Sequence, residues 1–548
     1  MMCRSLIVLL SLFSFLSHSI YSDETPKLPI GMNIPSYNHH TPNKMFMDVM
    51  KSASSWITFN PKVKGWSTNK ADELQLDEQG YPLELPFLAS DGTAQAVKFL
   101  INNKYKGVYK FLYDGVGEFR FNVKVNQENG VNYLVLDGKG GNKWINILSS
   151  KKGDHIRNIR IIPLDIPEDS VEIFHPLFLE GLKPFHCLRF MDTMKINGSK
   201  QTIWETRSRP DNYSQGLDNG VAIEYLIELC NVLNCDAWFC VPHQADDDYI
   251  RQFAQLVRDT LNPELKVYIE YSNEIWNWMF SQSHYVLNNA PGAKDLYVQE
   301  DLKKINPGPS VHPEKDAYMM QRVFNIWSEE FGQESQDRFV RVAPVQFVWV
   351  DNTRRILEYL FKTDENGQSL TSDKYSTSTG QGCDVVAATG YFGYEKTDHE
   401  RWLSMSPESV TPELIMEAVE KKFDSKVYAN IIENVDLVRK WGVDYIVYEG
   451  GQHVQPFQQK EWPYNQAIWD AQIDPRMYQM YMKVFKTHAS DKVNCKLFCA
   501  YNYVGNREQK WGSWGHLESL DQLLLLDEIN DVAPKYGALL DANLQKSN

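Results

Sequence analysis

The clearest indication of chemistry in this chain is residues 266–278, which read KVYIEYSNEIWNW. The first residues of this stretch are β-branched or aromatic, which is typical of a strand, and Asn273, Glu274 and Trp276 follow where the strand would end. An amide that binds a hydroxyl, a carboxyl that donates a proton and an indole that stacks on a ring are the groups that sugar chemistry needs. An ordinary polar loop is the alternative interpretation, and for a lone Asn-Glu pair it is the more common one.

A second carboxyl group, Glu449, follows the apolar segment 445–448 in the same way. If the two glutamates meet, one must be protonated at rest and the other ionised. Glu274 suits the proton donor, because burial beside Trp276 or repulsion by its partner would raise its pKa. Glu449 suits a nucleophile that a tyrosine hydroxyl and an arginine hold ionised. A separation of about 5–5.5 Å between the carboxyls would retain the anomeric configuration, and about 6.5–9.5 Å would invert it.

Two further residues are placed to hold such a carboxylate. Arg189 lies in the segment LRFMD, and Tyr391 lies in ATGYFGY, just past another predicted strand. An arginine inside a barrel needs a partner, and Asp192 offers a purely structural one. Core packing is an equally good explanation of Tyr391.

His243, Trp511 and Trp514 are the remaining candidates for contacts with a sugar. His243, in CVPHQADDD, could bond a sugar hydroxyl or serve as a structural histidine. The two tryptophans, in NREQKWGSWGHL, offer stacking surfaces or act as lids on a neighbouring loop. Glu270, four residues before Glu274, is interpreted as structural.

The elements that must position these residues alternate between short apolar segments and helical periodicity. The predicted strands are 29–33, 188–191, 237–241, 267–271, 339–343, 385–389, 445–448 and 497–501. The predicted helices are 43–52, 219–233, 247–261, 314–331, 353–361, 412–422, 427–441, 475–488 and 519–544. Eight strands alternating with helices predict an α/β fold, a closed (β/α)8 TIM barrel, whose active site lies at the carboxyl ends of the strands. A doubly wound open sheet is the alternative, but no Gly-x-Gly-x-x-Gly follows an early strand.

Residues 56–165 interrupt this rhythm with alternating segments separated by Asp-Gly and Asn-Gly turns. The pattern predicts an antiparallel, β-rich, sandwich-like insertion after the first barrel strand. Such an insertion either binds carbohydrate or braces the mouth of the barrel. The predicted organisation is therefore a signal peptide at 1–22, the first barrel strand and helix at 23–55, the insertion at 56–165 and the remainder of the barrel at 166–548.

The predicted signal peptide has a positive residue, Arg4, followed by an apolar run that is too short to span a bilayer. It predicts a secreted protein, in the extracellular space or the lumen of the secretory or lysosomal route, with no membrane association after its removal. A membrane anchor is the less favoured alternative. The sequons at Asn197 and Asn212 suit an exported glycoprotein.

The net charge indicates the class of partner, and the cysteines indicate whether disulfides or a metal site are expected. The formal net charge of −15 argues against nucleic acid and suits a neutral or basic glycan. Seven cysteines lie outside the signal peptide, and the pairs Cys230/Cys235 and Cys495/Cys499 are spaced for local disulfides. The absence of a CxxC pair or His-rich tract gives no reason to expect a metal, and no cofactor is expected. Nothing in the sequence indicates the oligomeric state.

The chain resembles clan A of the glycoside hydrolases, which are retaining enzymes on (β/α)8 barrels. The resemblance rests on Asn273-Glu274 after the fourth predicted strand and Glu449 after the seventh, and it covers the barrel but not the insertion. It implies that Glu274 is the acid/base, that Glu449 is the nucleophile and that Asn273 binds the 2-hydroxyl. Ile275 stands where many families of the clan have proline. The phrases YSNEIWN and LRFMD also resemble secreted proteins often labelled cellulose-binding.

Two functions follow as hypotheses. The first is a secreted retaining glycosidase that degrades a polysaccharide or its oligosaccharides by double displacement. The second is a non-catalytic protein that binds a cellulose-like glycan on the same scaffold. Intact Asn273, Glu274 and Glu449 favour the first, because a decayed site usually loses one of them.

Overall fold

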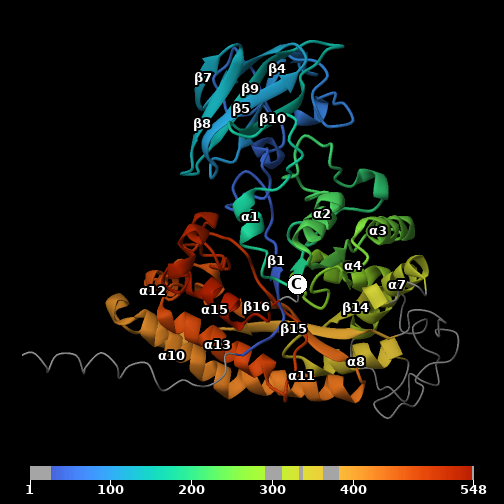
Figure 1. Ribbon diagram of the computed structural model, residues 1–548, viewed down its shortest axis with the longest axis vertical. Coiled ribbons are helices and arrows are strands. Elements are labelled where there is room, and N and C mark those ends of the chain that lie inside the picture. The colour runs from blue at the N-terminus through green and yellow to red at the C-terminus, as the bar shows by residue number, and fades with distance from the viewer. Residues whose placement is uncertain (1–25, 291–311, 333–336, 362–381, 546–548) are drawn as a thin grey trace, which may run out of the picture.

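The computed structural model describes residues 26–290, 312–332, 337–361 and 382–545 (Figure 1). The predicted signal peptide lies outside these described residues. Figure 1 shows two lobes, with a β-rich lobe formed by an early part of the chain above a larger lobe of strands and helices. No helix in the described ranges is both long enough and apolar enough to cross a membrane.

The larger lobe is a closed barrel of eight parallel strands, paired in chain order from β1 to β17 and back to β1. These strands are β1 (Ile30–Asn33), β11 (Cys187–Arg189), β12 (Asp236–Val241), β13 (Val267–Tyr271), β14 (Phe339–Pro344), β15 (Val385–Phe392), β16 (Asp444–Gln452) and β17 (Phe498–Ala500). Most of their residues are buried, as expected for strands that face side chains inside the barrel and helices outside it. The predicted barrel is confirmed.

Helices cover the outside of the barrel between successive strands (Figure 1). The main ones are α2 (Ile223–Leu233), α3 (Asp247–Thr260), α4 (Ser281–Asn289), α7 (His312–Phe331), α8 (Val350–Phe361), α10 (Pro412–Lys422), α11 (Tyr428–Lys440), α13 (Pro475–Ala489) and α15 (Pro534–Ala542). The shorter ones are α1 (Pro176–Glu180), α9 (Lys396–Leu403), α12 (Asn465–Asp470) and α14 (Ile529–Val532). The predicted closing helix at 519–544 is instead split into a 3₁₀ segment, α14 and α15.

The predicted helix at 43–52 is wrong, because only Val49–Ser52 coils, as a 3₁₀ turn. The residues before it run extended, and the Met47 amide bonds the carbonyl of Ile173 at 2.9 Å. Phe46 likewise forms a bridge to Phe174. Backbone groups that a helix would have used internally are thus taken by a distant segment.

The smaller lobe is an insertion between β1 and β11 made of two antiparallel sheets. One sheet has the order β10-β5-β8-β7, and the other has the order β2-β4-β9-β6, with β3 (Phe87–Leu88) paired to β4. Their bounds are β2 (Ile57–Phe59), β4 (Ala94–Ile101), β5 (Lys106–Asp114), β6 (Gly117–Phe121), β7 (Lys124–Glu128), β8 (Val131–Asp137), β9 (Lys143–Ser150) and β10 (Arg157–Pro163). The expected β-rich insertion is confirmed.

Each lobe has its own hydrophobic core. The insertion buries residues such as Phe99, Phe111 and Ile147 between its sheets, and Tyr213 from the barrel lobe completes that cluster. The seven cysteines in the described part of the chain are buried, and none of them forms a disulfide. The suggested disulfides Cys230/Cys235 and Cys495/Cys499 are therefore wrong. Cys495 instead directs its thiol at the carbonyl of Leu497, 3.2 Å away.

Candidate active site

Arg189, at the end of β11, joins the polar side chains at the carboxyl end of the barrel. Its Nη1 donates to Glu449 Oε1 at 2.7 Å, and its Nη2 donates to Asn273 Oδ1 at 2.9 Å. Its Nε donates to Glu270 Oε2 at 3.0 Å. Burial opposes the charge of this fully buried guanidinium, but Glu270 and Glu449 outweigh it and raise the pKa of Arg189 well above its ordinary value. The arginine is therefore a fixed cation between two carboxylates.

Glu449, at 5% exposure, is held from two sides. Besides the bond from Arg189, its Oε2 accepts a hydrogen bond from Tyr391 Oη at 2.9 Å. Burial raises the pKa of Tyr391 well above its ordinary value, so this phenol keeps its proton and remains a donor. A cation and a hydroxyl donor favour the ionised form of the carboxyl they contact. The sequence places Arg189 and Tyr391 as holders of a carboxylate, and the structure brings both to Glu449.

A one-residue irregularity in β16 shapes this site. Val447 pairs with Ala388 of β15, but Glu449 pairs with the next residue, Thr389, so Tyr448 has no partner of its own. Strict alternation would put Tyr448 and Glu449 on opposite faces. Here the Tyr448 ring lies 5.1 Å from the Arg189 guanidinium, and Glu449 also reaches that guanidinium. The register shift turns both side chains into the barrel.

Glu274 lies in a less polar setting than Glu449. Burial, and after it the negative charge of Glu449, raises the pKa of Glu274 to about 7. Asn277 Nδ2 donates to its Oε2 at 2.8 Å, which opposes this rise. Tyr448 Oη lies 3.5 Å from its Oε1. The charge of Glu449 thus acts on Glu274, which is about half protonated near pH 7.

The loop that carries Asn273 and Glu274 has an unusual backbone. Ser272 and Glu274 both have positive φ, at 57° and 42°. This region is unfavourable for residues other than glycine and is often found at functional sites. Asn273 between them points to Arg189, and its Nδ2 donates to Asn197 Oδ1 at 3.1 Å. The Asn197 carboxamide, part of a predicted glycosylation sequon, is therefore engaged beside the site.

The structure separates the two tryptophans of the last loop. The Trp514 ring lies 5.7 Å from the Tyr391 ring and 5.2 Å from the His453 ring, which places it beside Glu449. Trp511 is 57% exposed. Lys510 Nζ lies above its ring, and Trp514 Nε1 donates a hydrogen bond to its carbonyl. Trp276 is partly buried, and its indole N–H has no hydrogen-bond partner among the described residues.

His243 lies just past the end of β12. It is 1% exposed, and its ring packs edge-on against Tyr285 at 5.2 Å. Burial lowers the pKa of His243 to about 4, so the imidazole is neutral at ordinary pH. Among the described residues, its Nε2 contacts Gln244, and its Nδ1 has no hydrogen-bond partner. Its contact with a sugar hydroxyl stays a prediction.

Several residues that sequence reasoning did not assign to the site belong to its polar network. Asn33, at the end of β1, accepts from Arg189 Nη1 at 3.0 Å, and Trp238 Nε1 donates to Glu270 Oε2 at 2.9 Å. Asp192 accepts from Tyr501 Oη at 2.7 Å, and burial raises its pKa to about 6. Asn33 and Tyr501 lie at or just past the ends of β1 and β17. Because all eight strand ends meet at one rim, this position was the sequence signal that could have identified them. The alternative interpretation paired Arg189 with Asp192 in a purely structural ion pair, but in the structure Asp192 bonds Tyr501 and Arg189 pairs with the two glutamates.

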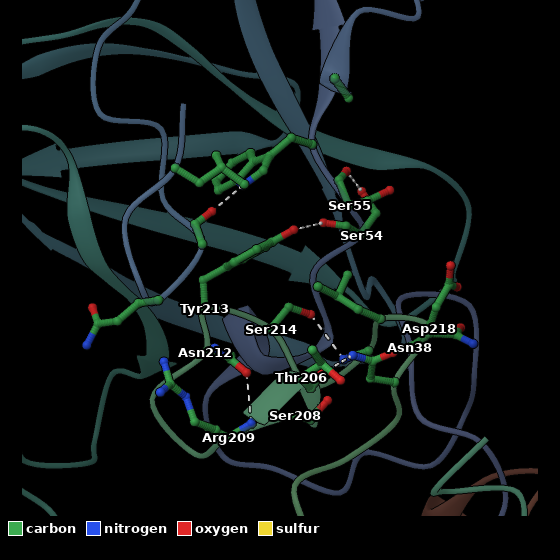
Figure 2. A pocket seen from close by; sticks show the side chains of 18 of the residues that line it. Asn38, Ser54, Ser55, Thr206, Ser208, Arg209, Asn212, Tyr213, Ser214 and Asp218 are labelled. Carbon is green, nitrogen blue, oxygen red and sulfur yellow. Dashed lines mark hydrogen bonds between the residues drawn. The ribbon is translucent and has the colours of Figure 1, made fainter. Parts of the chain in front are cut away.

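A cavity of about 770 Å³ lies at the junction of the insertion and the barrel loops (Figure 2). Neither Glu274 nor Glu449 lines it. Figure 2 shows hydrogen bonds among the residues of its wall, such as Tyr213 Oη to the Ser54 carbonyl at 3.3 Å. The Arg209 amide bonds Asn212 Oδ1 at 2.8 Å in the same wall. Because these polar groups bond one another, the wall of this cavity suits a structural contact between the two lobes.

No known family model matches the sequence, and no curated protein matches it. Among solved structures, the chain is similar to the GH51 arabinofuranosidase of Xanthomonas axonopodis pv. citri, with a TM-score of 0.35, 11% identity and 63% of each chain covered. It is similar to xylanase10C of Cellvibrio japonicus, with a TM-score of 0.36, 11% identity, and 89% of this chain and 97% of the xylanase covered. It is also similar to a Trichoderma harzianum β-glucosidase double mutant, with a TM-score of 0.31, 11% identity and coverage of 61% and 79%.

The closed barrel of this chain is shown by the pairing of its own strands. The alignment spans less than two thirds of the length of the arabinofuranosidase. Likeness at this level of identity and TM-score carries no conclusion about activity.

Proposed function

We propose that this chain is a secreted retaining glycoside hydrolase acting on β-glycosidic bonds of a poly- or oligosaccharide. The observation that carries the proposal is the unequal setting of two carboxyls at one end of the barrel. Glu449 accepts bonds from Arg189 and Tyr391, whereas burial and the charge of Glu449 raise the pKa of Glu274 to about 7. Unequal pKa values in a carboxyl pair are how such enzymes divide the roles of acid and nucleophile.

In the first step, Glu449 attacks the anomeric carbon while Glu274 gives its proton to the departing glycosidic oxygen. A glycosyl ester forms on Glu449, and the bond to the leaving sugar breaks. In the second step, Glu274 takes a proton from water, and the water oxygen displaces Glu449 from the same carbon. The two inversions together retain the anomeric configuration, and both carboxyls return to their starting protonation states.

The neighbouring side chains support these steps. Arg189 donates to one oxygen of Glu449, and Tyr391 donates to the other, so both contacts hold the carboxyl in place for attack. The Asn273 amide, fixed by Arg189 and Asn197, lies next to Glu274 and suits a sugar 2-hydroxyl. Trp514, packed on Tyr391, offers an indole beside Glu449 for stacking on a sugar face. A proton donor, a nucleophile, a hydroxyl-binding amide and a stacking surface thus surround one position.

An activated 2-deoxy-2-fluoro glycoside tests the proposal, because the fluorine slows the second step more than the first. We expect time-dependent inactivation and a single glycosyl adduct, which peptide mass spectrometry locates on Glu449. The Glu449→Gln variant should take up no label, and Trp511→Ala, an exposed change, should label at the native rate. Saturable binding of the matching sugar with no adduct would favour a non-catalytic glycan-binding protein.

A further inference from the structure

The insertion carries a cavity of about 460 Å³ on the outer face of its β2-β4-β9-β6 sheet. Alternation along the strands directs Val97, Phe99 and Ile147 into the core between the sheets. Lys98 on β4 pairs with Asn146 on β9, and Asn146 pairs with Arg120 on β6, so these three side chains share the opposite, outer face. This volume is in the range of pockets that hold small ligands.

Aromatic rings wall this cavity. The loop that follows β2 places Trp66 edge-on against Trp144 of β9, with 5.2 Å between the ring centroids. Trp66 is 47% exposed although it belongs to this cluster. Phe59, at the end of β2, adds a third ring to the lining. An exposed indole on this loop, with a second ring at right angles on the sheet, is a surface on which a sugar ring can stack.

The charges around the cavity have one sign. Of the described residues that line it, Lys62, Lys64, Lys98 and Arg120 are cationic and none is acidic. Lys98 is only 4% exposed, and its Nζ lies 3.9 Å from the centroid of the Trp66 ring and 5.2 Å from that of Phe59. Within the described ranges, no carboxylate forms an ion pair with Lys98. A buried ammonium held only by rings retains the capacity to bind an anion.

Amides complete the lining and supply groups for hydroxyls. Asn60, Asn122 and Asn146 all line the cavity. Asn146 uses its Nδ2 on the carbonyl of Arg120, at 2.7 Å, which fixes the side chain on the outer face. The chain as a whole carries a formal charge of −15, so this cationic patch runs against the overall charge. The pocket is therefore a local exception to the net charge of the chain, and its lysines and arginine can bind an anionic group at short range, where the distant acidic residues are screened.

We propose that this outer face, centred on Lys98, Trp66 and Trp144, is a binding site for an acidic saccharide, a sugar chain that carries carboxylate or sulfate groups. The indoles stack on a sugar ring, the amides bond its hydroxyls, and Lys98 with Arg120 binds its anionic group. The site belongs to the insertion and does not include Glu274 or Glu449. It would hold a charged polysaccharide on the enzyme independently of cleavage, and it stands whether or not the barrel hydrolyses that polysaccharide.

Isothermal titration of the full chain tests this site. The probes are trigalacturonate for carboxylate, a short sulfated galactan for sulfate, cellotetraose as the neutral control and a short oligothymidylate as the non-sugar anion. We expect one or both acidic saccharides to bind at least about tenfold more tightly than cellotetraose and oligothymidylate, with affinity that falls as salt rises. The saccharide that binds more tightly identifies the anionic group.

Matched variants locate the binding. Lys98→Met and Trp66→Ala should each weaken it about tenfold or more. Lys124→Met on β7 and Trp511→Ala in the barrel should leave it unchanged. Lys98→Met removes a buried charge, and Trp66→Ala changes a half-exposed side chain, so neither variant should have a lower melting temperature. An unchanged melting temperature is therefore the check that each variant is folded. The proposal is overturned if neither acidic saccharide binds, if oligothymidylate binds more tightly than both, or if folded Lys98→Met binds like the native chain.

Discussion

Arg189 and Glu449 come from strands on different sides of the barrel, and they meet in a 2.7 Å ion pair at its carboxyl end. The same guanidinium also bonds Glu270, so one buried cation balances two buried carboxylates. Glu449 in turn contacts Tyr391. This arrangement fixes the position of the Glu449 carboxyl between a cation and a hydroxyl donor.

Arg189→Met should destabilise the protein, because it leaves two carboxylates buried without a cation. We expect the free energy of unfolding, measured by urea denaturation, to fall by about 3–5 kcal/mol. Lys396→Met, which breaks an exposed pair with Glu400, should cost no more than about 1 kcal/mol. The double variant Arg189→Met/Glu270→Gln should recover part of the loss. Equal losses in the two single variants would contradict the buried network.

Tyr391→Phe should slow turnover without unfolding the protein. It removes one hydrogen bond to a charged oxygen of Glu449, a contact worth about 1.5–3 kcal/mol. We therefore expect kcat/KM to fall about tenfold to a hundredfold, with the melting temperature nearly unchanged. Tyr394→Phe, whose hydroxyl bonds the Gln455 carbonyl, is the matched control and should keep native kinetics. Native kinetics in Tyr391→Phe would remove this tyrosine from the mechanism.

The raised pKa of Glu274, about 7, predicts the pH dependence. The acid must be protonated, so kcat/KM should fall as pH rises through about 7. Asn277 lowers this pKa, and Asn277→Ala should move the falling limb to higher pH. Between the ordinary carboxyl pKa and about 7, the folded state binds more protons than the unfolded state, so stability should decline with rising pH in that interval. Glu274→Gln should weaken that decline, and the part that remains belongs to other buried carboxyls such as Asp192, whose pKa is also raised. A decline as steep as that of the native chain would contradict the raised pKa of Glu274.

Trp514→Ala and Trp511→Ala should differ in kinetics. Trp514 packs against Tyr391 beside Glu449, whereas Trp511 is largely exposed. Loss of a stacking surface worth about 0.5–1.5 kcal/mol should lower kcat/KM up to about tenfold in Trp514→Ala. Trp511→Ala should stay near native. Steady-state kinetics on an oligosaccharide substrate would contradict this assignment if the two variants behaved alike.

The barrel, and the place of the two glutamates at the carboxyl ends of its strands, could be predicted because they depend on chain order. Apolar segments such as 267–271 recur between amphipathic helices, and parallel strands bring their carboxyl ends to one rim. The roles expected of Arg189 and Tyr391 as holders of a carboxylate followed from the same logic. These features need no knowledge of loop conformation.

Other features of the site depend on local geometry that sequence patterns do not encode. Tyr448 faces the site because β16 shifts register by one residue, which strict alternation does not predict. Glu274 lies on a loop with left-handed backbone at a non-glycine residue. The helix expected at 43–52 fails because tertiary contacts with residues 173–175 outweigh local propensity. Trp511 and Trp514 look alike in sequence and differ only through the path of their loop.

Azide products from the two glutamate variants test the central claim most directly. If Glu449 is the nucleophile and Glu274 the acid/base, Glu274→Ala should still form the glycosyl ester from an activated aryl glycoside. Azide should then attack from the β face and give a β-glycosyl azide. Glu449→Ala should form no ester, and azide entering the vacated space should give the α-glycosyl azide. The same anomer from both variants, or native hydrolysis by either without azide, would contradict the account.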